Sequence, residues 1–408
     1  MKQRVILHCD ANNFYASCEC AQNSNLFDKP VAVTGNPQKR TGIILAKNNL
    51  AKQYGISTGD VIWQAKQKCP ELICVSPHFD LYNKYSRKLK EIYMQYTDQV
   101  ESFSIDECWL DVTDTQKFFG TGEEIANKIR EQVKKELNIT ISVGVSFCKL
   151  FAKLGSDMKK PDAVTVISEA NFTNKIYPLP INSIMGIGRR LEKALSKMNI
   201  ETLGDFVKIP DSILSKKFGI NGTRLKQKLL GNDFDIVKKF NEYDEVKSIG
   251  NGTTTIMDIK NIDDMKSVVM FLCDEIATRL RNKKMLSFCI SASLRSSDLV
   301  WSGKSKTLNF PTNTEKDIFK TAMELIKCIW DLTSPIRSVR ICCSSLVDEA
   351  NNFQINLFEN PTKKSNLNNA IDKVRKKYGY QAISPLVSIN PKLINQDALR
   401  LDKYDDEI

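Results

Sequence analysis

Three carboxylates are the residues of this 408-residue chain whose types and spacing best suit chemistry. Asp106 and Glu107 are adjacent and follow the apolar-alternating run 100–105, and Asp10 follows the apolar run 5–9. Neighbouring side chains of a regular strand point to opposite faces, so adjacent acids can serve one site only where the backbone turns. We therefore expect all three acids to lie at strand ends.

Acids at strand ends are suited to binding Mg²⁺, which takes carboxylate oxygens together with substrate phosphate. Two such ions about 3.5 to 4 Å apart would stabilise the attacking and the leaving oxygen of a displacement at phosphorus. A single acid at a strand end is more often a solvated turn residue than a metal ligand. The flanking residues are therefore needed to choose between these two interpretations. Acid–base catalysis by histidine is not favoured, because the chain has only two histidines, His8 and His78. A structural zinc site is not favoured either, because the chain has no paired C-x-x-C ligands.

The charge of the chain favours a polyanionic partner. The formal net charge is +11, and residues 169–233 hold eleven Lys and Arg against six Asp and Glu. Residues 1–168 hold twenty-two against nineteen, a smaller surplus in a much longer segment. The middle segment is therefore the predicted contact surface for a phosphate backbone.

The composition also indicates the cellular compartment in which the protein is expected. Twelve cysteines are scattered through the chain, many inside apolar runs, which is typical of reduced core thiols rather than of a disulfide framework. No apolar run approaches the roughly 18 residues that span a bilayer, and the start turns polar too early for a signal peptide. We expect a cytoplasmic protein without a membrane segment.

The elements that must position the acids are read from periodicity and turn residues. Asp106 and Glu107 are expected at or near the turn of a hairpin that returns over 108–112, and Asp10 at the end of the strand Val5–Cys9. Further strands are expected at Thr140–Ser146 and Ala163–Ile167, and helices at Leu45–Tyr54, Val61–Lys68, Asp80–Tyr96, Glu123–Glu136 and up to Met158. This alternation predicts an α+β sheet layer with helices on one face.

The rest of the chain divides into a basic helical segment, a charged linker and a second α+β domain. The second domain is predicted from the strands Phe288–Leu294 and Ser338–Ser344 and the helices Asp263–Asn282 and Glu315–Leu332. A tail rich in Asn and Lys follows, with a helical stretch near Leu367–Tyr378.

Three motifs carry a resemblance to a known family. Residues 10–19 (DANNFYASCE), 104–107 (SIDE) and 157–161 (DMKKP) closely resemble the Y-family translesion DNA polymerases of the bacterial polymerase IV and UmuC type. The resemblance implies a right-hand α+β fold, with a palm at 1–13 and 78–168, small fingers at 14–77 and a helix-hairpin-helix thumb at 169–233. It further implies a linker at 234–245, an α+β little finger at 246–346 and a flexible tail at 347–408.

The resemblance also assigns the acids. Asp10, Asp106 and Glu107 would be the catalytic ligands of two Mg²⁺ ions, and the backbone carbonyl of Ala11 would complete the shell of one ion. The implied activity is attack of a primer 3′-hydroxyl on the α-phosphate of a dNTP, on a DNA template. Small fingers imply loose checking of the new pair, low fidelity and a role in lesion bypass and repair.

Nucleotide-binding residues follow by the same resemblance. Tyr15 matches the steric gate that excludes a ribose 2′-hydroxyl, although a core aromatic would suit Phe14 or Tyr15 equally and only the motif register separates them. Lys160 matches the lysine that reaches the triphosphate. Many members place Thr, Tyr and Arg where this chain has Ala46, Asn49 and Lys52, which puts the contacts of Asn49 and Lys52 in doubt because Lys cannot bind phosphate bidentately.

DNA contacts are expected along the palm, thumb and little finger. Gly186, Ile187, Gly188 and Arg189 have the G-x-G pattern with which backbone N–H groups approach a phosphate, although a lone G-x-G is more often a turn. The segment 247–255 resembles the entry into the little finger, where Thr253 and Thr254 would hold template phosphates; a Gly-rich strand edge is the compatible alternative. Ser104 of the acidic motif is also assigned to DNA.

A sliding clamp is the expected protein partner. Gln354, Leu357 and Phe358 resemble the Q-x-x-L-F peptide that binds bacterial clamps, and a tether of this kind raises the effective concentration at the primer. The protein is otherwise expected to be a monomer, and the basic stretch 370–375 remains unassigned beyond a helix.

Two rival functions remain open at this point. A two-metal nuclease could use the same ions to activate water, but it has no incoming nucleotide for an aromatic gate to screen. A non-catalytic clamp- and DNA-binding accessory would need none of the three acids. Primer extension, primer shortening or binding without either would separate the three functions.

Overall fold

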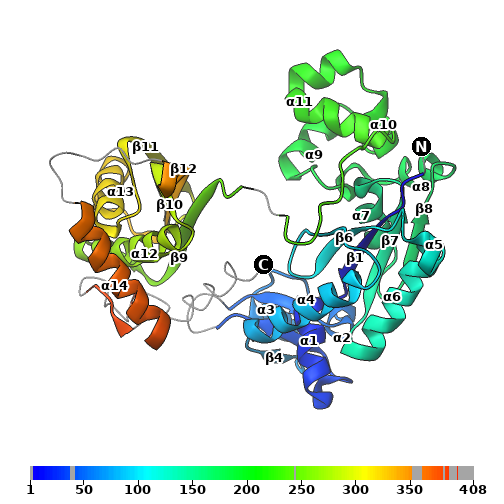
Figure 1. Ribbon diagram of the computed structural model, residues 1–408, viewed down its shortest axis with the longest axis horizontal. Coiled ribbons are helices and arrows are strands. Elements are labelled where there is room, and N and C mark those ends of the chain that lie inside the picture. Colours follow the sequence, from blue (N-terminus) through cyan, green and yellow to red (C-terminus); the bar gives the residue numbers. More distant parts are fainter. Residues whose placement is uncertain are drawn as a thin grey trace. The chain divides into compact units, whose positions relative to one another are not determined.

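The computed structural model describes residues 3–36, 42–242, 245–351, 361–379, 382–385 and 393, which form two compact units (Figure 1). The first unit contains the described residues up to 242, and the second those from 245 onward. Among these residues, no helix combines the length and the apolar character needed to span a membrane.

The first unit is built on a five-stranded sheet with the order β5-β6-β1-β7-β8. Its central strand β1 pairs antiparallel with β6 on one side and β7 on the other, while β7 and β8 are parallel. The strands are β1 (Ile6–Ala11), β5 (Val100–Ser102), β6 (Glu107–Asp111), β7 (Ile141–Ser146) and β8 (Val164–Ile167). The predicted hairpin is confirmed, because β5 pairs with β6 and the acids lie at the turn between them.

Helices cover both faces of this sheet, so the expectation of helices on one face is wrong, and the side chains of β1 alternate between the two layers (Figure 1). Leu7 and Cys9 lie in the core formed with α4 (Phe79–Met94) and α6 (Gly122–Leu137), whose apolar stripes pack on one face. Ile6 instead joins Ala152 of α7 (Lys149–Met158) on the other face. Since side chains of a strand alternate, His8 and Asp10 share the α7 face with Ile6.

A glycine lets α7 approach the sheet closely. Gly144 of β7 lies beside His8 in the register, and a Cβ built there would be 1.9 Å from the Ala152 carbonyl oxygen and 2.5 Å from the Ser156 nitrogen. Only a residue without a side chain fits under the α7 backbone at this distance. The close approach places the α7 residues Lys153 and Ser156 next to His8 and Asp10.

A smaller sheet, β3-β2-β4, precedes α4 in the same unit. Its strands are β2 (Val31–Thr34), β3 (Ile44–Lys47) and β4 (Ile73–Val75), and the nearby helices are α1 (Phe14–Gln22), α2 (Asn49–Gln53) and α3 (Ile62–Lys68). The predicted helix Leu45–Tyr54 is wrong in its first half. Residues 46 and 47 pair with β2, and the helix begins only after Asn48, whose Oδ1 accepts the N–H of Ala51 as an N-cap.

A short helix, α5 (Gln116–Phe119), precedes α6. Four helices form the last part of the first unit: α8 (Phe172–Ile176), α9 (Arg189–Ser196), α10 (Leu203–Lys208) and α11 (Asp211–Leu229), the last with a kink at Gly219. Helices α8 to α11 bury a core of their own, and Phe151 and Leu154 of α7 belong to that core. The helix α7 therefore connects the central sheet to the basic helical segment.

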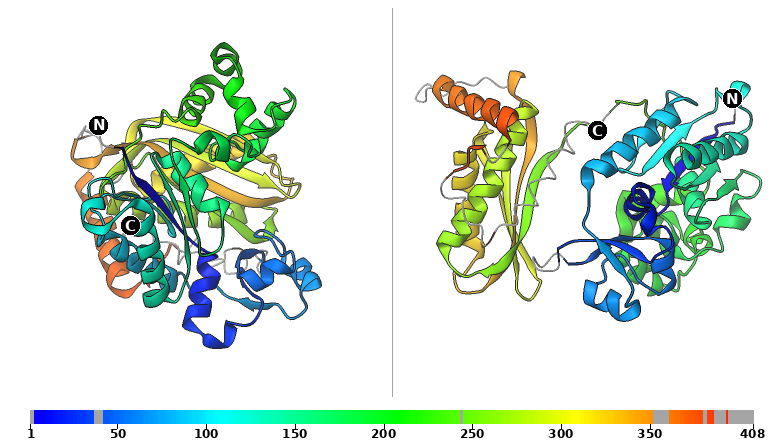
Figure 2. Two further views of the ribbon diagram at one scale, coloured as in Figure 1. Left: turned by 90° about the vertical axis from the view of Figure 1, so that its right-hand side faces the viewer. Right: turned by 90° about the horizontal axis from the view of Figure 1, so that it is seen from below.

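The second unit is a four-stranded antiparallel sheet, β11-β10-β12-β9, with α12 (Ile262–Asn282) and α13 (Glu315–Ile329) packed on one face (Figure 2). Its strands are β9 (Ser248–Ile259), β10 (Met285–Ser296), β11 (Trp301–Thr312) and β12 (Ile336–Asp348). The strand β11 was not predicted, because most of its residues are polar and exposed and they show no apolar alternation. It lies at the edge of the sheet.

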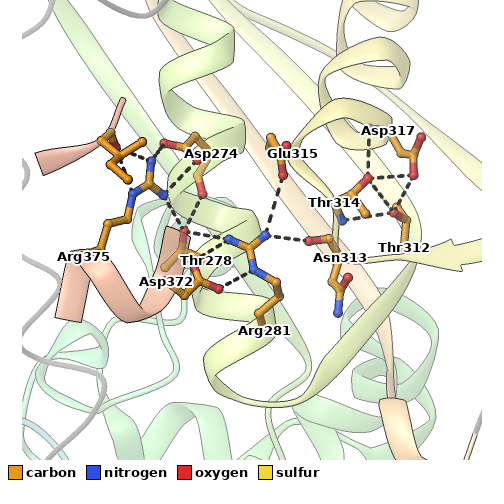
Figure 3. Close-up of polar contacts among 11 residues, drawn as sticks. Asp274, Thr278, Arg281, Thr312, Asn313, Thr314, Glu315, Asp317, Asp372 and Arg375 are labelled. Carbon is orange, nitrogen blue, oxygen red and sulfur yellow. Dashed lines mark hydrogen bonds and ion pairs between the residues drawn. The ribbon is translucent and has the colours of Figure 1, made fainter. Parts of the chain in front are cut away.

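The helix α14 (Pro361–Tyr378) adds a further element to this unit, and it falls in the segment expected to be a flexible tail. Figure 3 shows two Arg–Asp pairs that join it to α12. Arg375 contacts Asp274 with N–O distances of 2.7 and 3.0 Å, and Arg281 contacts Asp372 at 2.6 and 2.8 Å. Leu393 is also buried in the core of the unit. The described part of the tail is thus docked.

The Arg375–Asp274 pair gives a stability prediction. Both side chains are at most 8% exposed, so Arg375→Ala removes a cation that pairs with a buried carboxylate, and breaking comparable pairs costs about 3 kcal/mol. We expect hydrogen exchange of the α12 amides to speed up by the equivalent of that loss, roughly a hundredfold. The exposed Lys376→Ala on the same helix is the control. Equal exchange in both variants would contradict the stabilising role of the pair.

Candidate active site

The sheet register brings two of the three predicted acids face to face. Asp10 of β1 and Glu107 of β6 are direct cross-strand partners, so their side chains share the face covered by α7. Asp10 is only 5% exposed. The neighbouring Ala11 ends β1, and its N–H donates to the Asp106 carbonyl at 3.2 Å, which ties the two strand ends together.

Two lysines from α7 and the residues after it neutralise these acids. Lys153 Nζ lies 2.8 Å from Glu107 Oε2 and 3.2 Å from Asp10 Oδ2, and Lys160 Nζ lies 2.8 Å from the same Asp10 oxygen. Lys160 also pairs with Asp157 at 2.9 Å. Burial would lower the pKa of both lysines, but the pairing with Asp10 and its neighbours raises it. Both ammonium groups therefore stay charged.

His8 is the third member of the cluster, and the sequence analysis had set histidine aside. The Ser156 hydroxyl donates to the Lys153 carbonyl, so its oxygen accepts from His8 Nδ1 at 2.8 Å. Burial lowers the pKa of His8, which keeps the ring neutral with its lone pair on Nε2. That atom lies 3.3 Å from Glu107 Oε2.

The donor atoms of the cluster suit a divalent cation. One donor atom each of His8, Asp10 and Glu107 lies within 4.8 Å of the others. His8 Nε2 is buried and lacks a hydrogen-bond partner among the described residues, whereas Glu107 Oε2 has the Lys153 ammonium at 2.8 Å. A buried polar atom without a partner is costly unless a cation or water satisfies it. Burial would raise the pKa of Glu107, but the Lys153 ammonium holds it well below its usual value, so the carboxylate is charged.

Asp106 lies beside this cluster rather than inside it. It sits in the turn between β5 and β6, where its carboxylate accepts a hydrogen bond from the Ser104 hydroxyl at 2.6 Å. Burial, together with the charges of Asp10 and Glu107, raises the pKa of Asp106 despite that bond. A third carboxylate held near two others gains most from a cation placed between them.

The two motif aromatics differ in exposure. Phe14 is buried at 4% exposure, whereas Tyr15 is half-buried, and both begin α1 directly after Ala11 and the loop 12–13. Burial and the nearby Asp106 carboxylate raise the pKa of Tyr15, so its hydroxyl is neutral and its ring lies close to the acids. Of the two rings, Tyr15 is therefore the one available to a substrate at the acidic cluster.

The remaining nucleotide-binding candidates lie on α2. Asn49 is its first residue and accepts a hydrogen bond from the Asn13 side chain at 2.9 Å, while Lys52 is exposed. The Asn13–Asn49 contact links α2 to the loop that follows Asp10. Among the described residues, Asn49 and Lys52 form no hydrogen bond or ion pair with the acidic cluster.

The residues predicted to contact DNA differ in their exposure. Gly186 has a φ of +99°, Gly188 is the N-cap of α9, and Arg189 is exposed at its first turn, whereas Ile187 is buried. In β9, Thr254 hydrogen-bonds Ser338, but Thr253 is 9% exposed and shares the strand face of the core residue Ile249. The expected side-chain contact of Thr253 is thus not favoured, because strand alternation turns it toward the helices.

Ser104 is engaged with Asp106, so its predicted DNA contact would have to compete with that bond. The clamp-binding candidates Gln354, Leu357 and Phe358 lie outside the described residues. The sequence analysis missed His8 and Lys153. Their signals were the alternation that puts His8 on the face of Asp10, and the seven-residue spacing of Lys153 and Lys160.

The chain is similar to curated and solved proteins along most of its length. The profile of the impB/mucB/samB family matches residues 9–157, and that of the family's C-terminal domain matches 246–357. The DNA polymerase IV of Acetivibrio thermocellus is 39% identical over 397 residues, covering 97% of this chain and 100% of that protein. DNA polymerase IV 2 of Bacillus subtilis is 34% identical, covering 95% of each chain.

A solved Y-family DNA polymerase chimera superposes with a TM-score of 0.73 at 24% identity, covering 84% of this chain and 99% of that one. This likeness confirms the predicted α+β right-hand fold.

Proposed function

The chain belongs to the impB/mucB/samB family of Y-family DNA polymerases, and we propose that it copies damaged DNA by two-metal transfer of a nucleotide to a primer 3′-hydroxyl. It is a DNA-directed DNA polymerase. The observation that carries the proposal is the cross-strand pair Asp10 and Glu107, with Asp106 and Tyr15 beside it and Lys160 in contact. Those are the groups that the reaction requires, gathered at one strand end.

The acids would hold the divalent cations that the family uses, which we propose to be two Mg²⁺ ions. Asp10, Asp106 and Glu107 offer the oxygens, and the Ala11 carbonyl would add another. Bound there, the ions would stabilise charge on the attacking and leaving oxygens. The fit is supported by the buried His8 Nε2 without a hydrogen-bond partner and by the burial of Asp106, which, with the charges of Asp10 and Glu107, raises the pKa of Asp106.

Lys160 would hold the triphosphate of the incoming dNTP. Its ammonium already lies within 2.8 Å of Asp10, so it is within reach of a phosphate bound at the same carboxylate. As a compact charge it would neutralise phosphate oxygens without demanding one geometry. Asn49 and Lys52 would complete the triphosphate pocket with weaker contacts, because Lys52 supplies a charge but cannot bind a phosphate bidentately.

Tyr15 would act as the sugar gate. Its half-exposed ring lies near Asp106, where the sugar of a bound nucleotide has to pass, while Phe14 is part of the core. A close-packed ring excludes an added hydroxyl because protein interiors have no free volume for it.

We propose that residues 1–13 and 78–168 are the palm, 14–77 the fingers, 169–233 the thumb, 234–245 the linker and 246–346 the little finger. The thumb would bind DNA phosphates through Gly186, Gly188 and Arg189, and the little finger through Thr254 and its neighbours. The Gln354, Leu357 and Phe358 peptide would bind the sliding clamp. The protein would act as a cytoplasmic monomer.

The ion pairs of Lys153 give a metal-binding prediction. Its ammonium occupies the carboxylate oxygens that a cation must take, so Lys153→Met is expected to tighten Mn²⁺ binding about tenfold in the absence of nucleotide. Electron paramagnetic resonance of free Mn²⁺ measures this. The control is Lys149→Met, which removes a neighbouring α7 lysine paired with Glu101 instead. Weaker or unchanged binding in Lys153→Met would contradict competition between the lysine and the cation.

Primer extension tests the proposed function. With Mg²⁺ and each dNTP supplied singly, we expect addition of the templated nucleotide to a primed strand, and continued addition opposite an abasic site. Shortening of the primer would favour the two-metal nuclease instead. Binding of primed DNA with neither extension nor shortening would favour the accessory.

A further inference from the structure

We propose that Asn12 positions Lys160, so that binding of the triphosphate depends on a buried amide as well as on the lysine itself. The inference rests on the proposed function, because it concerns how the phosphate-binding lysine of that polymerase is held. Asn12 lies in the loop between β1 and the helix α1 that carries Tyr15. The sequence analysis assigned no role to it.

Three hydrogen bonds hold the side chain of Asn12. Its Oδ1 accepts the backbone N–H of Asp162 at 3.0 Å and the hydroxyl of Thr140 at 3.1 Å. Its Nδ2 donates to the Ser142 hydroxyl at 2.9 Å. Because a backbone N–H can only donate, the atom that faces Asp162 has to be the oxygen, which settles the orientation of the amide.

The N–H that this amide binds lies close to the lysine in the chain. Only Pro161, whose ring fixes its own φ angle, separates Asp162 from Lys160. The hydrogen bond lies within the five-residue connection 159–163 between α7 and β8. A displacement of the Asp162 backbone would therefore move the Lys160 ammonium from its place 2.8 Å from Asp10 Oδ2.

The carboxylate of Asp162 is held by α6. Arg130 Nη1 lies 2.7 Å from one of its oxygens, and Lys134 Nζ lies 3.0 Å from the other. Burial would raise the pKa of Asp162, but the two cations lower it, so the carboxylate is charged. Asp162 has a φ of +54°, a costly conformation that persists only where the surroundings impose it. Asn12 and the two cations provide those surroundings.

Burial makes the contacts of Asn12 durable. Asn12 is 5% exposed and Ser142 is 0% exposed, so water has little access to the amide. Removing the amide would leave the Asp162 N–H and two hydroxyl groups without this partner, which is costly where they are buried. The backbone of Asn12 is also fixed, because its N–H donates to the Thr140 carbonyl at 2.9 Å. Two segments of the active site are thus joined through one side chain.

The test separates substrate affinity from the rate of reaction. In single-turnover primer extension, we expect Asn12→Ala to raise the KM for dNTP about tenfold, while the rate at saturating dNTP falls less than about threefold. Asn12→Asp keeps oxygens that can accept from Asp162 and Thr140, so we expect a KM within about threefold of the wild type. Thr97→Val is the matched control, because it removes a similarly buried hydroxyl that donates to the Asp111 carbonyl.

A double variant shows whether Asn12 acts through Lys160. In the Lys160→Ala background, Asn12→Ala should raise the KM no further, because the group that it positions is gone. An equal rise in both backgrounds would overturn the inference, as would an unchanged KM in Asn12→Ala while dNTP addition persists. A rise in Thr97→Val as large as that in Asn12→Ala would also overturn it, by showing a general loosening of the fold.

Hydrogen exchange of the wild-type chain gives a measurement that does not depend on the folding of a variant. The Asp162 amide is expected to exchange at least about a hundredfold more slowly than an unprotected amide, because it is bonded to Asn12. Exchange at the unprotected rate would overturn the inference. Absence of dNTP addition in the wild type, with the Asp162 amide protected, would instead refute the proposed function.

Discussion

Asp10→Asn is expected to slow nucleotide addition by at least about a thousandfold in Mg²⁺, which is the largest effect that we predict for a single substitution. Asp10 contacts the other charged members of the cluster. It faces Glu107 across the strands and pairs with both Lys153 and Lys160. An amide is close in shape to a carboxylate, so the sheet should fold normally. It lacks the charge that would bind the cations.

Single-turnover extension with saturating dNTP measures this rate, and a binding titration with primed DNA shows that the variant still engages its template. Asp263→Asn is the control, because that acid is exposed in the second unit and pairs only at the surface with Lys266. A rate within tenfold of the wild type for Asp10→Asn would show that the acids at this strand end do not carry the reaction.

Tyr15→Ala is expected to reduce selection against ribonucleotides by about a hundredfold while dNTP addition continues. The change removes the half-exposed ring beside Asp106 but leaves the carboxylates and lysines in place. The kinetic constants for dCTP and CTP opposite a template guanine measure it, with the KM for the ribonucleotide expected to change most. The matched Phe14→Leu variant tests the neighbouring core ring.

Two outcomes would refute this assignment. If Phe14→Leu relaxed sugar selection and Tyr15→Ala did not, the gate would be the other aromatic. If neither variant did, the sugar would be read elsewhere in the pocket. Equal losses of dNTP and rNTP addition in Tyr15→Ala would indicate a folding or binding defect instead.

The hairpin that carries the acids could be predicted from the sequence because its signal is local. Alternating apolar residues, a turn and a return strand lie within 100–112, and the structure has β5 and β6 there with Asp106 in the turn. The helices α4, α6, α12 and α13 were predicted for the same reason, since each carries a long apolar stripe of helical period.

Partners from distant parts of the chain could not be predicted in this way. Lys153 lies 143 residues from Asp10 and reaches it only because α7 packs onto β1 over Gly144. His8 looks like one more residue of a buried strand until the register with Glu107 is known. Contacts of this kind depend on tertiary packing, which the local periodicity of the sequence does not predict.

Two failures have a different physical cause. At Leu45–Tyr54, the helix propensity of the residues predicted a single helix. In the structure, residues 44–47 pair with β2 and form a strand, and Asn48 caps a shorter helix that follows it. The polar β11 was missed because an edge strand with an open face needs no apolar alternation. The docking of α14 had no local signal, because Arg375 and Asp372 of this helix pair with Asp274 and Arg281 of the distant helix α12.

The central claim is that the acids at the end of β1 and β6 hold the reacting metal ions. Its most direct test is a crystal structure with primed template, a non-hydrolysable dNTP analogue and Mn²⁺, in which anomalous scattering locates the ions. The account predicts two peaks shared among Asp10, Asp106 and Glu107, because hard cations prefer carboxylate oxygens. A bound nucleotide with no peak at these carboxylates would contradict it.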